Sequence, residues 1–179
     1  MDKMTITEAL AELKTIDKRL EKKRQSVMGY LFRQTCLKDP MEEHGGSKSH
    51  VSQERQAVQD IEKRRMNIRL AIQKTNLETH IEIAGETKSI AGWLVWRSDV
   101  ATGRKNFLHG MMTSINKMRN DIQSKGMRVV DGDSTNAQSD VVINLNEKDL
   151  IDSMEIMETT LGELDGQLSL KNATTFVEI

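Results

Sequence analysis

The chain has 179 residues and is nearly neutral, because 26 basic side chains offset 27 acidic ones and leave a formal net charge of −1. Charged residues make up 30% of the chain, apolar residues 37% and aromatic residues 3%, and there is one proline. The longest uninterrupted apolar run, residues 90–96, is far shorter than the roughly 20 residues of a membrane-spanning helix. The composition also excludes a disordered chain and is typical of a helical protein.

The charges are distributed unevenly along the chain. Residues 1–130 hold 24 Lys and Arg against 16 Asp and Glu, a net +8, whereas residues 131–179 hold 2 against 11, a net −9. Either the acidic C-terminal helix packs beside basic helices of the same chain, or each region faces a partner of opposite sign. The single cysteine, Cys36, suits a reducing compartment, and the N-terminus lacks the apolar segment of a secretory signal. We therefore expect a protein made in the cytoplasm.

The first half of the chain is predicted to form an antiparallel helical hairpin. Thr5 and Glu8 have the spacing of a capping box, which marks the start of a long amphipathic helix. The apolar residues that follow recur at spacings of three, four and seven, and Pro40 and Gly45 lie in the loop before the next helix. The expected elements are a helix over 6–34, a loop over 36–49, a helix over 52–75 and a short strand over 79–83.

The second half is predicted to form a second helical hairpin. Ser89 is expected to cap its first helix, and the polar centre of that helix, which includes Gly103, is expected to be a weak point or a kink. Gly126 is placed to end this helix, and Asn146 is expected to cap the final one. The expected elements are a helix over 90–124, a β-hairpin with strands at 127–130 and 140–145, a helix from 147 onwards and a terminal strand within 172–179.

Residues 68–83 and 164–179 align without gaps, with an asparagine near each helix end and a short strand after it. The asparagines, Asn76 and Asn172, suit the C-terminal end of a helix. The alignment predicts either two related units, about residues 1–85 and 86–179 of a single elongated domain over 1–179, or a chance similarity of two amphipathic helix ends. The strands can pair with each other, with the β-hairpin or with another subunit, and the terminal strand is a candidate for cross-chain addition.

Three segments carry a resemblance to a known family. They are the helix end Ile-Gln-Lys-Thr-Asn-Leu-Glu-Thr at 72–79, the helix start Ser-Ile-Ala-Gly-Trp-Leu-Val-Trp-Arg at 89–97, and the helix end at 161–175. Together they resemble the septicolysin-like family of small helical bacterial and phage proteins of largely unknown function. The resemblance covers most of the chain. It implies a fold rather than an activity, and it brings no catalytic residues to carry over.

The sequence holds no motif for catalysis, cofactor binding or metal binding. His44 and His50 flank the Gly-Gly loop without the spacing of metal ligands, and the segment that opens at Asp131 lacks the later ligands of a calcium loop. The basic clusters at 18–24 and 63–69 are diluted by acidic residues and lack aromatic neighbours, so nucleic-acid binding is not expected. We predict no enzyme, no cofactor and no metal, with a metal protein or small enzyme built on the histidine loop as a minor alternative.

The candidate functional residues are suited to protein contacts. The run 90–96 is apolar on every side of a helical turn, which predicts either a corner of the core or a subunit interface. The candidate interface residues are Trp93, Trp96, Met111, Met112, Phe176, Val177 and Ile179.

We expect a mainly α, non-enzymatic structural protein made of two helical hairpins with short strands. The setting that we expect is a tailed-phage virion (head, neck or connector), assembled in the host cytoplasm. Its expected partners are other copies of itself or other virion proteins, and no membrane is involved. The alternative is a soluble bacterial protein that forms homo-oligomers in the cytoplasm and binds other proteins.

Overall fold

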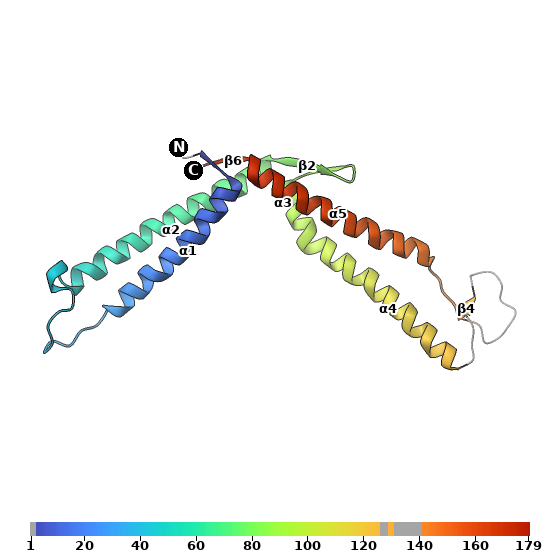
Figure 1. Cartoon of the computed structure of the whole chain (residues 1–179), viewed down its shortest axis with the longest axis horizontal. Helices are drawn as coiled ribbons and strands as arrows, with labels where there is room; N and C mark the ends of the chain where they lie inside the picture. The colour runs from blue at the N-terminus through green and yellow to red at the C-terminus, as the bar shows by residue number, and fades with distance from the viewer. Residues whose placement is uncertain (1–2, 126–128, 131–140) are drawn as a thin grey trace. The chain divides into compact units, whose positions relative to one another are not determined.

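The computed structural model describes residues 3–125, 129–130 and 141–179. In this part of the chain four long helices, one of them formed by α3, η2 and α4 in succession, produce the mainly α fold that the composition predicts (Figure 1). The elements in chain order are β1 (Lys3–Thr5), α1 (Ile6–Gly29), η1 (Glu42–His44), α2 (Ser47–Glu78), β2 (His80–Ile83), β3 (Glu86–Ser89), α3 (Ile90–Val95), η2 (Trp96–Ala101), α4 (Thr102–Ser124), β4 (Val129–Val130), β5 (Val141–Val142), α5 (Glu147–Thr174) and β6 (Phe176–Glu178).

The chain divides into two compact units. The first unit comprises residues 1–79 and 168–179, and the second comprises residues 80–167, so α5 begins in the second unit and ends in the first. These bounds differ from the units of about 1–85 and 86–179 that the sequence alignment predicts. The difference arises because the C-terminal strand pairs with the N-terminal one.

In the first unit, α1 and α2 lie side by side in opposite directions (Figure 1). The predicted capping box starts α1: the Thr5 hydroxyl accepts a hydrogen bond from the Glu8 amide at 3.2 Å, and the Glu8 carboxylate accepts one from the Thr5 amide at 2.7 Å. The helix ends at Gly29, five residues before the predicted end at 34. The buried core of this unit consists of Ile6, Ala9, Leu13, Ile16, Leu20, Ile68, Ile72 and Val177.

The first unit also contains an antiparallel pair of strands, in which β1 pairs with β6. A strand before α1 is not predicted by the sequence, and this pairing is none of those that the sequence left open. Val177 of β6 is fully buried against the helical core, whereas its neighbour Phe176 is 54% exposed. The terminal strand is therefore fixed within its own chain along one edge.

In the second unit, β2 and β3 form a tight antiparallel hairpin that the sequence analysis missed. Its two turn residues, Ala84 and Gly85, both have positive φ values, of 51° and 79°, as in the turns that best fit the twist of paired strands. The hairpin predicted at 127–145 is wrong, because β4 and β5 pair in parallel, and parallel neighbours cannot be joined by a hairpin turn. Gly126 and the turn at 131–139 lie outside the described residues.

The long helix of the second unit is π-helical over η2, within the polar centre where the sequence predicts a weak point. The buried residues Trp93 and Ala101 are eight positions apart, whereas the later buried positions repeat every seven: Ala101, Leu108, Ile115 and Ile122. One extra residue rotates an α-helix by about 100°, and a π-helical turn absorbs it. The irregularity thus restores the buried face, and Gly103 follows it in regular α-helix.

The two aligned segments have the same secondary structure at equivalent positions. Helix α2 ends at Glu78 and β2 starts at His80, while α5 ends at Thr174 and β6 starts at Phe176, 96 positions later in each case. Both helices continue two residues past Asn76 and its counterpart, so the prediction that these asparagines end the helices is wrong. The predicted cap at the other end of α5 is confirmed, since the Asn146 side chain accepts a hydrogen bond from the Lys148 amide at 3.0 Å.

Candidate functional site

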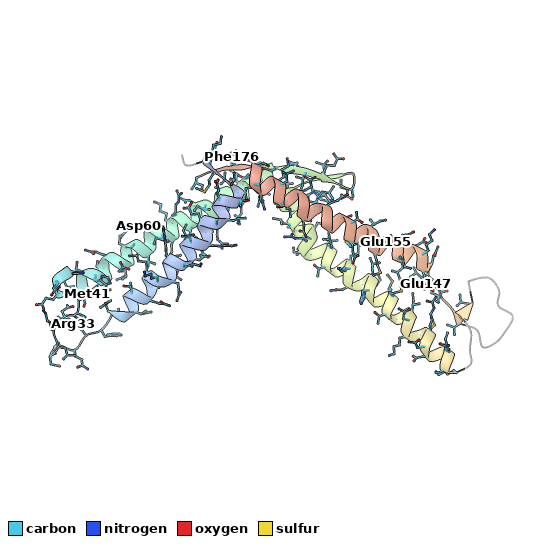
Figure 2. All side chains as sticks on the ribbon, viewed as in Figure 1. Arg33, Met41, Asp60, Glu147, Glu155 and Phe176 are labelled. Atoms are coloured by element: carbon cyan, nitrogen blue, oxygen red, sulfur yellow. The ribbon has the colours of Figure 1, made fainter. Side chains whose placement is uncertain are left out.

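The predicted interface residues are mostly turned into the two units. Trp93 and Val177 are buried, with exposed fractions of 2% and 0%. The half-buried members are Trp96, Met111, Met112 and Ile179, of which Met111, Met112 and Ile179 pack against the cores. Phe176 alone among the seven is mostly exposed, on the outer face of β6 (Figure 2).

Trp93 belongs to the core of the second unit, one of the two roles that the sequence left open. Its ring N–H donates to the Ile81 carbonyl at 3.1 Å, and the Lys88 ammonium lies 4.4 Å from the ring centroid. The Trp96 ring meets it edge to face at 5.3 Å between centroids. These contacts join α3 to the β2–β3 hairpin, so the indole stabilises the unit and is not presented to a partner.

The histidine loop has a structural role. The His50 ring nitrogen lies 2.9 Å from the Ser26 hydroxyl, and the ring packs edge to face on Tyr30, which ties the end of α1 to the start of α2. His44 lies exposed on η1. Among the described residues, no group of three or more His, Cys, Asp and Glu side chains is arranged to hold a metal ion.

The loop that joins α1 to α2 presents large apolar side chains to solvent. We call residues 28–46 the hairpin tip; Figure 2 labels Arg33 and Met41 within it. The exposed fraction is 86% for Phe32, 62% for Leu37 and 72% for Met28. Aromatic side chains are enriched at protein interfaces, which makes the exposed Phe32 a candidate contact residue. The tip is not among the sites predicted from the sequence, although two adjacent apolar residues at the end of the helical stripe, Leu31 and Phe32, and a leucine in a polar loop, Leu37, are signals for it.

The hairpin tip is held in shape by the carboxylate of Asp39. It accepts hydrogen bonds from the Met41 amide at 2.9 Å, from the Ser47 amide at 3.0 Å and from the Ser47 hydroxyl, and Arg33 lies 3.6 Å away. The Ser47 hydroxyl and these two amides hold the pKa of Asp39 at about 2. The backbone of residues 39–47 is therefore fixed, while the apolar side chains of Phe32 and Leu37, which precede it, remain exposed.

A second apolar surface lies on the other unit. An open groove of about 630 Å³ runs between α4 and the segment that precedes α5. We call it the apolar groove; it is lined by Asn106, Phe107, Gly110, Met111, Ser114, Ile115, Ile143, Asn144 and Leu145. None of these side chains is charged, and Phe107 and Leu145 remain 65% and 40% exposed. The predicted interface residue Met111 lies in this groove.

A smaller cavity beside the tryptophans has less capacity for a ligand. Its volume is about 270 Å³, below the range of about 300–1,000 Å³ that is usual for small-molecule sites. Trp96, Arg104 and Met157 line it, together with residues of the β2–β3 turn. We therefore take the hairpin tip and the apolar groove as the candidate site.

Part of the charge asymmetry is resolved within the chain. In the second unit α5 is bound to the preceding helix by ion pairs, including Arg97–Asp165 at 2.9 Å, Lys105–Glu158 at 3.6 Å and Arg119–Glu147. An excess remains in each unit. The first unit has 17 Lys and Arg against 13 Asp and Glu, a net +4, and the second has 9 against 14, a net −5.

The comparisons with known proteins identify the fold and no activity. No protein-family model and no curated protein matches this chain. Among solved structures, a functionally unknown conserved protein from Corynebacterium diphtheriae is similar, with a TM-score of 0.58 and 12% sequence identity over 99% of this chain and 100% of that one. Among the described helices, none combines the length and the apolar content that a membrane span requires. The chain thus shares its fold with a bacterial protein whose function is itself unknown.

Proposed function

We propose that this chain is a non-enzymatic assembly protein that binds neighbouring protein subunits through its hairpin tip. The observation that carries the proposal is Phe32, which is 86% exposed on a loop whose later part, residues 39–47, is fixed by the Asp39 carboxylate. The side chain of Arg33, next to Phe32, lies 3.6 Å from the same carboxylate. Aromatic anchors supply much of the energy of protein interfaces. A loop that is already ordered loses less conformational entropy when it binds, so more of that energy appears as affinity.

The assembly that we propose to test first is a tailed-phage virion, because the sequence resembles a family of bacterial and phage proteins. In that setting the partners are other copies of this chain or other virion proteins. The net charges of +4 and −5 on the two units support a protein that meets partners of opposite sign on its two parts.

The test is site-specific photo-crosslinking in the native host, with the reactive amino acid at position 32. The matched control places it at position 70, because Leu70 is another exposed large apolar residue of the first unit, with an exposed fraction of 57%. We expect discrete protein adducts from position 32 and none from position 70, with the partner identified by mass spectrometry. Equal labelling at the two positions, or no adduct at position 32, would contradict the proposal.

A further inference from the structure

We propose that the cavity beside the tryptophans binds a small organic acid, whose carboxylate is held by Arg104 and Trp96. We call it the tryptophan cavity; its volume is about 270 Å³, and all of its lining residues belong to the second unit. The volume equals that of about nine water molecules at about 30 Å³ each, so the ligand is smaller than a drug-sized molecule. The cavity is separate from the hairpin tip, and the inference goes beyond the proposed function.

The tryptophan cavity contains a positive charge that the described part of the chain does not neutralise. Arg104 lines the cavity and, among the described residues, has no ion pair or hydrogen bond. Arg97 and Lys105 of the same long helix, by contrast, pair with acidic residues of α5. The acidic side chain that lines the cavity, Glu86, is paired with Lys88. The guanidinium of Arg104 is therefore available, and it can bind a carboxylate through two parallel hydrogen bonds.

The hydrogen-bonding groups of the cavity also fit an anion. The Trp96 ring N–H lacks a partner among the residues that the structure describes, and Trp96 lines the cavity beside Arg104. The hydroxyls of Ser153 and Thr160, which also line it, each donate to a backbone carbonyl of α5 at 2.7 Å and add no free donor. The free donors are thus the guanidinium and the indole N–H, and the oxygen atoms of a carboxylate accept from both.

The other walls of the cavity are apolar. Ile83, Trp93 and Met157 line it and are almost fully buried, with exposed fractions of 2%, 2% and 5%. Ile156 also lines it and is 65% exposed. Pockets with apolar walls and a few polar groups bind organic molecules, and the polar groups fix the orientation of the ligand. This lining favours an acid with an apolar body over inorganic phosphate.

Two irregular stretches of backbone border the cavity. In a regular α-helix, positions eight apart such as Trp96 and Arg104 point about 80° away from each other. The π-helical turn η2 lies between them and offsets this rotation, so both line the cavity. Ala84, a non-glycine residue with a φ of 51°, lines it from the β2–β3 turn. π-helical turns and non-glycine residues at positive φ are both frequent at functional sites.

The test measures the binding of para-fluorophenylacetate to the full chain by fluorine NMR. Its neutral amide, para-fluorophenylacetamide, has nearly the same size and lacks the charge. The site variants are Arg104→Gln and Trp96→Phe. The matched control is Arg97→Gln, which removes an arginine of the same long helix that does not line the cavity. Circular dichroism verifies that each variant is folded.

A second measurement locates the bound acid. The chain has two tryptophans, so a proton–nitrogen correlation spectrum contains two indole N–H signals, and Trp96→Phe assigns them. We expect the Trp96 signal to move during the titration and to give the same Kd as the fluorine signal.

We expect the wild type to bind the acid with a Kd below about 1 mM and the amide at least about tenfold more weakly. Arg104→Gln should weaken binding of the acid at least about tenfold and leave the amide unchanged, because the charge-assisted hydrogen bonds are lost. Trp96→Phe should weaken binding of the acid about two- to tenfold, as for one neutral hydrogen bond. Arg97→Gln should bind both compounds like the wild type.

Other outcomes would overturn the inference. Equal affinity for the acid and the amide, or no binding of the acid at about 5 mM, removes the role of the charge. An Arg104→Gln variant that binds the acid like the wild type places any binding elsewhere. Inorganic phosphate that displaces the acid at the acid's own Kd shows that the apolar walls play no part. If Arg104→Gln does not fold, the acid–amide comparison and the Trp96 signal of the wild type decide the question.

Discussion

Replacing Trp93 by phenylalanine should destabilise the second unit far more than the same change at Trp96. The Trp93 ring is 2% exposed and its N–H donates to the Ile81 carbonyl, whereas the Trp96 ring is half-buried. In the described part of the chain, the Trp96 ring N–H has no hydrogen-bond partner. The two rings touch each other, so each variant serves as the control for the other.

The expected magnitude follows from what Trp93→Phe removes. Losing the hydrogen bond to Ile81 costs about 1 kcal/mol, and leaving that buried carbonyl without its partner adds to the loss. The smaller ring leaves a void in a site where complete removal of a tryptophan side chain costs about 3–5 kcal/mol, so the void should contribute about 1–2 kcal/mol. We expect a total of about 2–3 kcal/mol for Trp93→Phe and about 1 kcal/mol or less for Trp96→Phe.

Urea unfolding followed by tryptophan fluorescence is the direct assay. The chain has two tryptophans, both in the second unit, so the one that remains in each variant reports on that unit alone. Circular dichroism at the same urea concentrations follows all helices and shows whether the first unit unfolds separately. Equal losses in the two variants, or a loss below about 0.5 kcal/mol for Trp93→Phe, would refute the assignment of Trp93 to the core.

Three further predictions concern the turn, the cap and the tip. Ala84→Asn should stabilise the chain by about 0.5–1 kcal/mol and raise Tm by about 1–4 °C, because asparagine tolerates the positive φ better. An unchanged or lower Tm in calorimetry would contradict this. Thr5→Ala should cost about 0.5–2 kcal/mol in urea unfolding and return the lowered pKa of Glu8 toward its ordinary value in an NMR titration. The folded-state pKa of Asp39 is lowered to about 2, so its contribution to stability is present above pH 4 and lost as the pH falls through 2. Amide exchange at Ser47 should therefore accelerate across that window in the wild type and not in Asp39→Asn, whereas identical pH profiles would contradict the assignment.

The long amphipathic elements were predictable from the sequence because their apolar spacing is a local property. The capping box at Thr5 and the cap at Asn146 are equally local, since each involves residues two or three positions apart. Strand pairing is different. The partner of β6 lies at the opposite end of the chain, and a three-residue strand at Lys3–Thr5 carries almost no periodic signal. The parallel pairing of β4 with β5 likewise depends on how the chain folds in three dimensions and has no local signal in the sequence.

The candidate site was less predictable than the fold. The tryptophans were selected because such residues favour interfaces, but the same size that suits an interface also suits a core, and only the packing around Trp93 separates the two roles. Phe32 was hidden because the helical pattern was extended to residue 34, whereas α1 ends at Gly29. Once the helix stops, Phe32 has no helical neighbour to pack on and projects into solvent. Among the residues that line the groove, Met111 is a predicted interface residue, because methionine suits the adaptable packing of helices or of partners.

The pairing of β1 with β6 has a consequence for the order in which the protein folds during synthesis. The core of the first unit includes Val177, and Lys3 pairs with Glu178, so the N-terminal unit remains incomplete until almost the whole chain has been made. Domains usually fold from the N-terminus at about 5–20 residues per second of translation. Here the second unit contains both strands of its own hairpin and can form first. The first unit waits for closure of a loop that spans the entire chain, and during that interval Ile6 and Ile68 lack the strand that covers them.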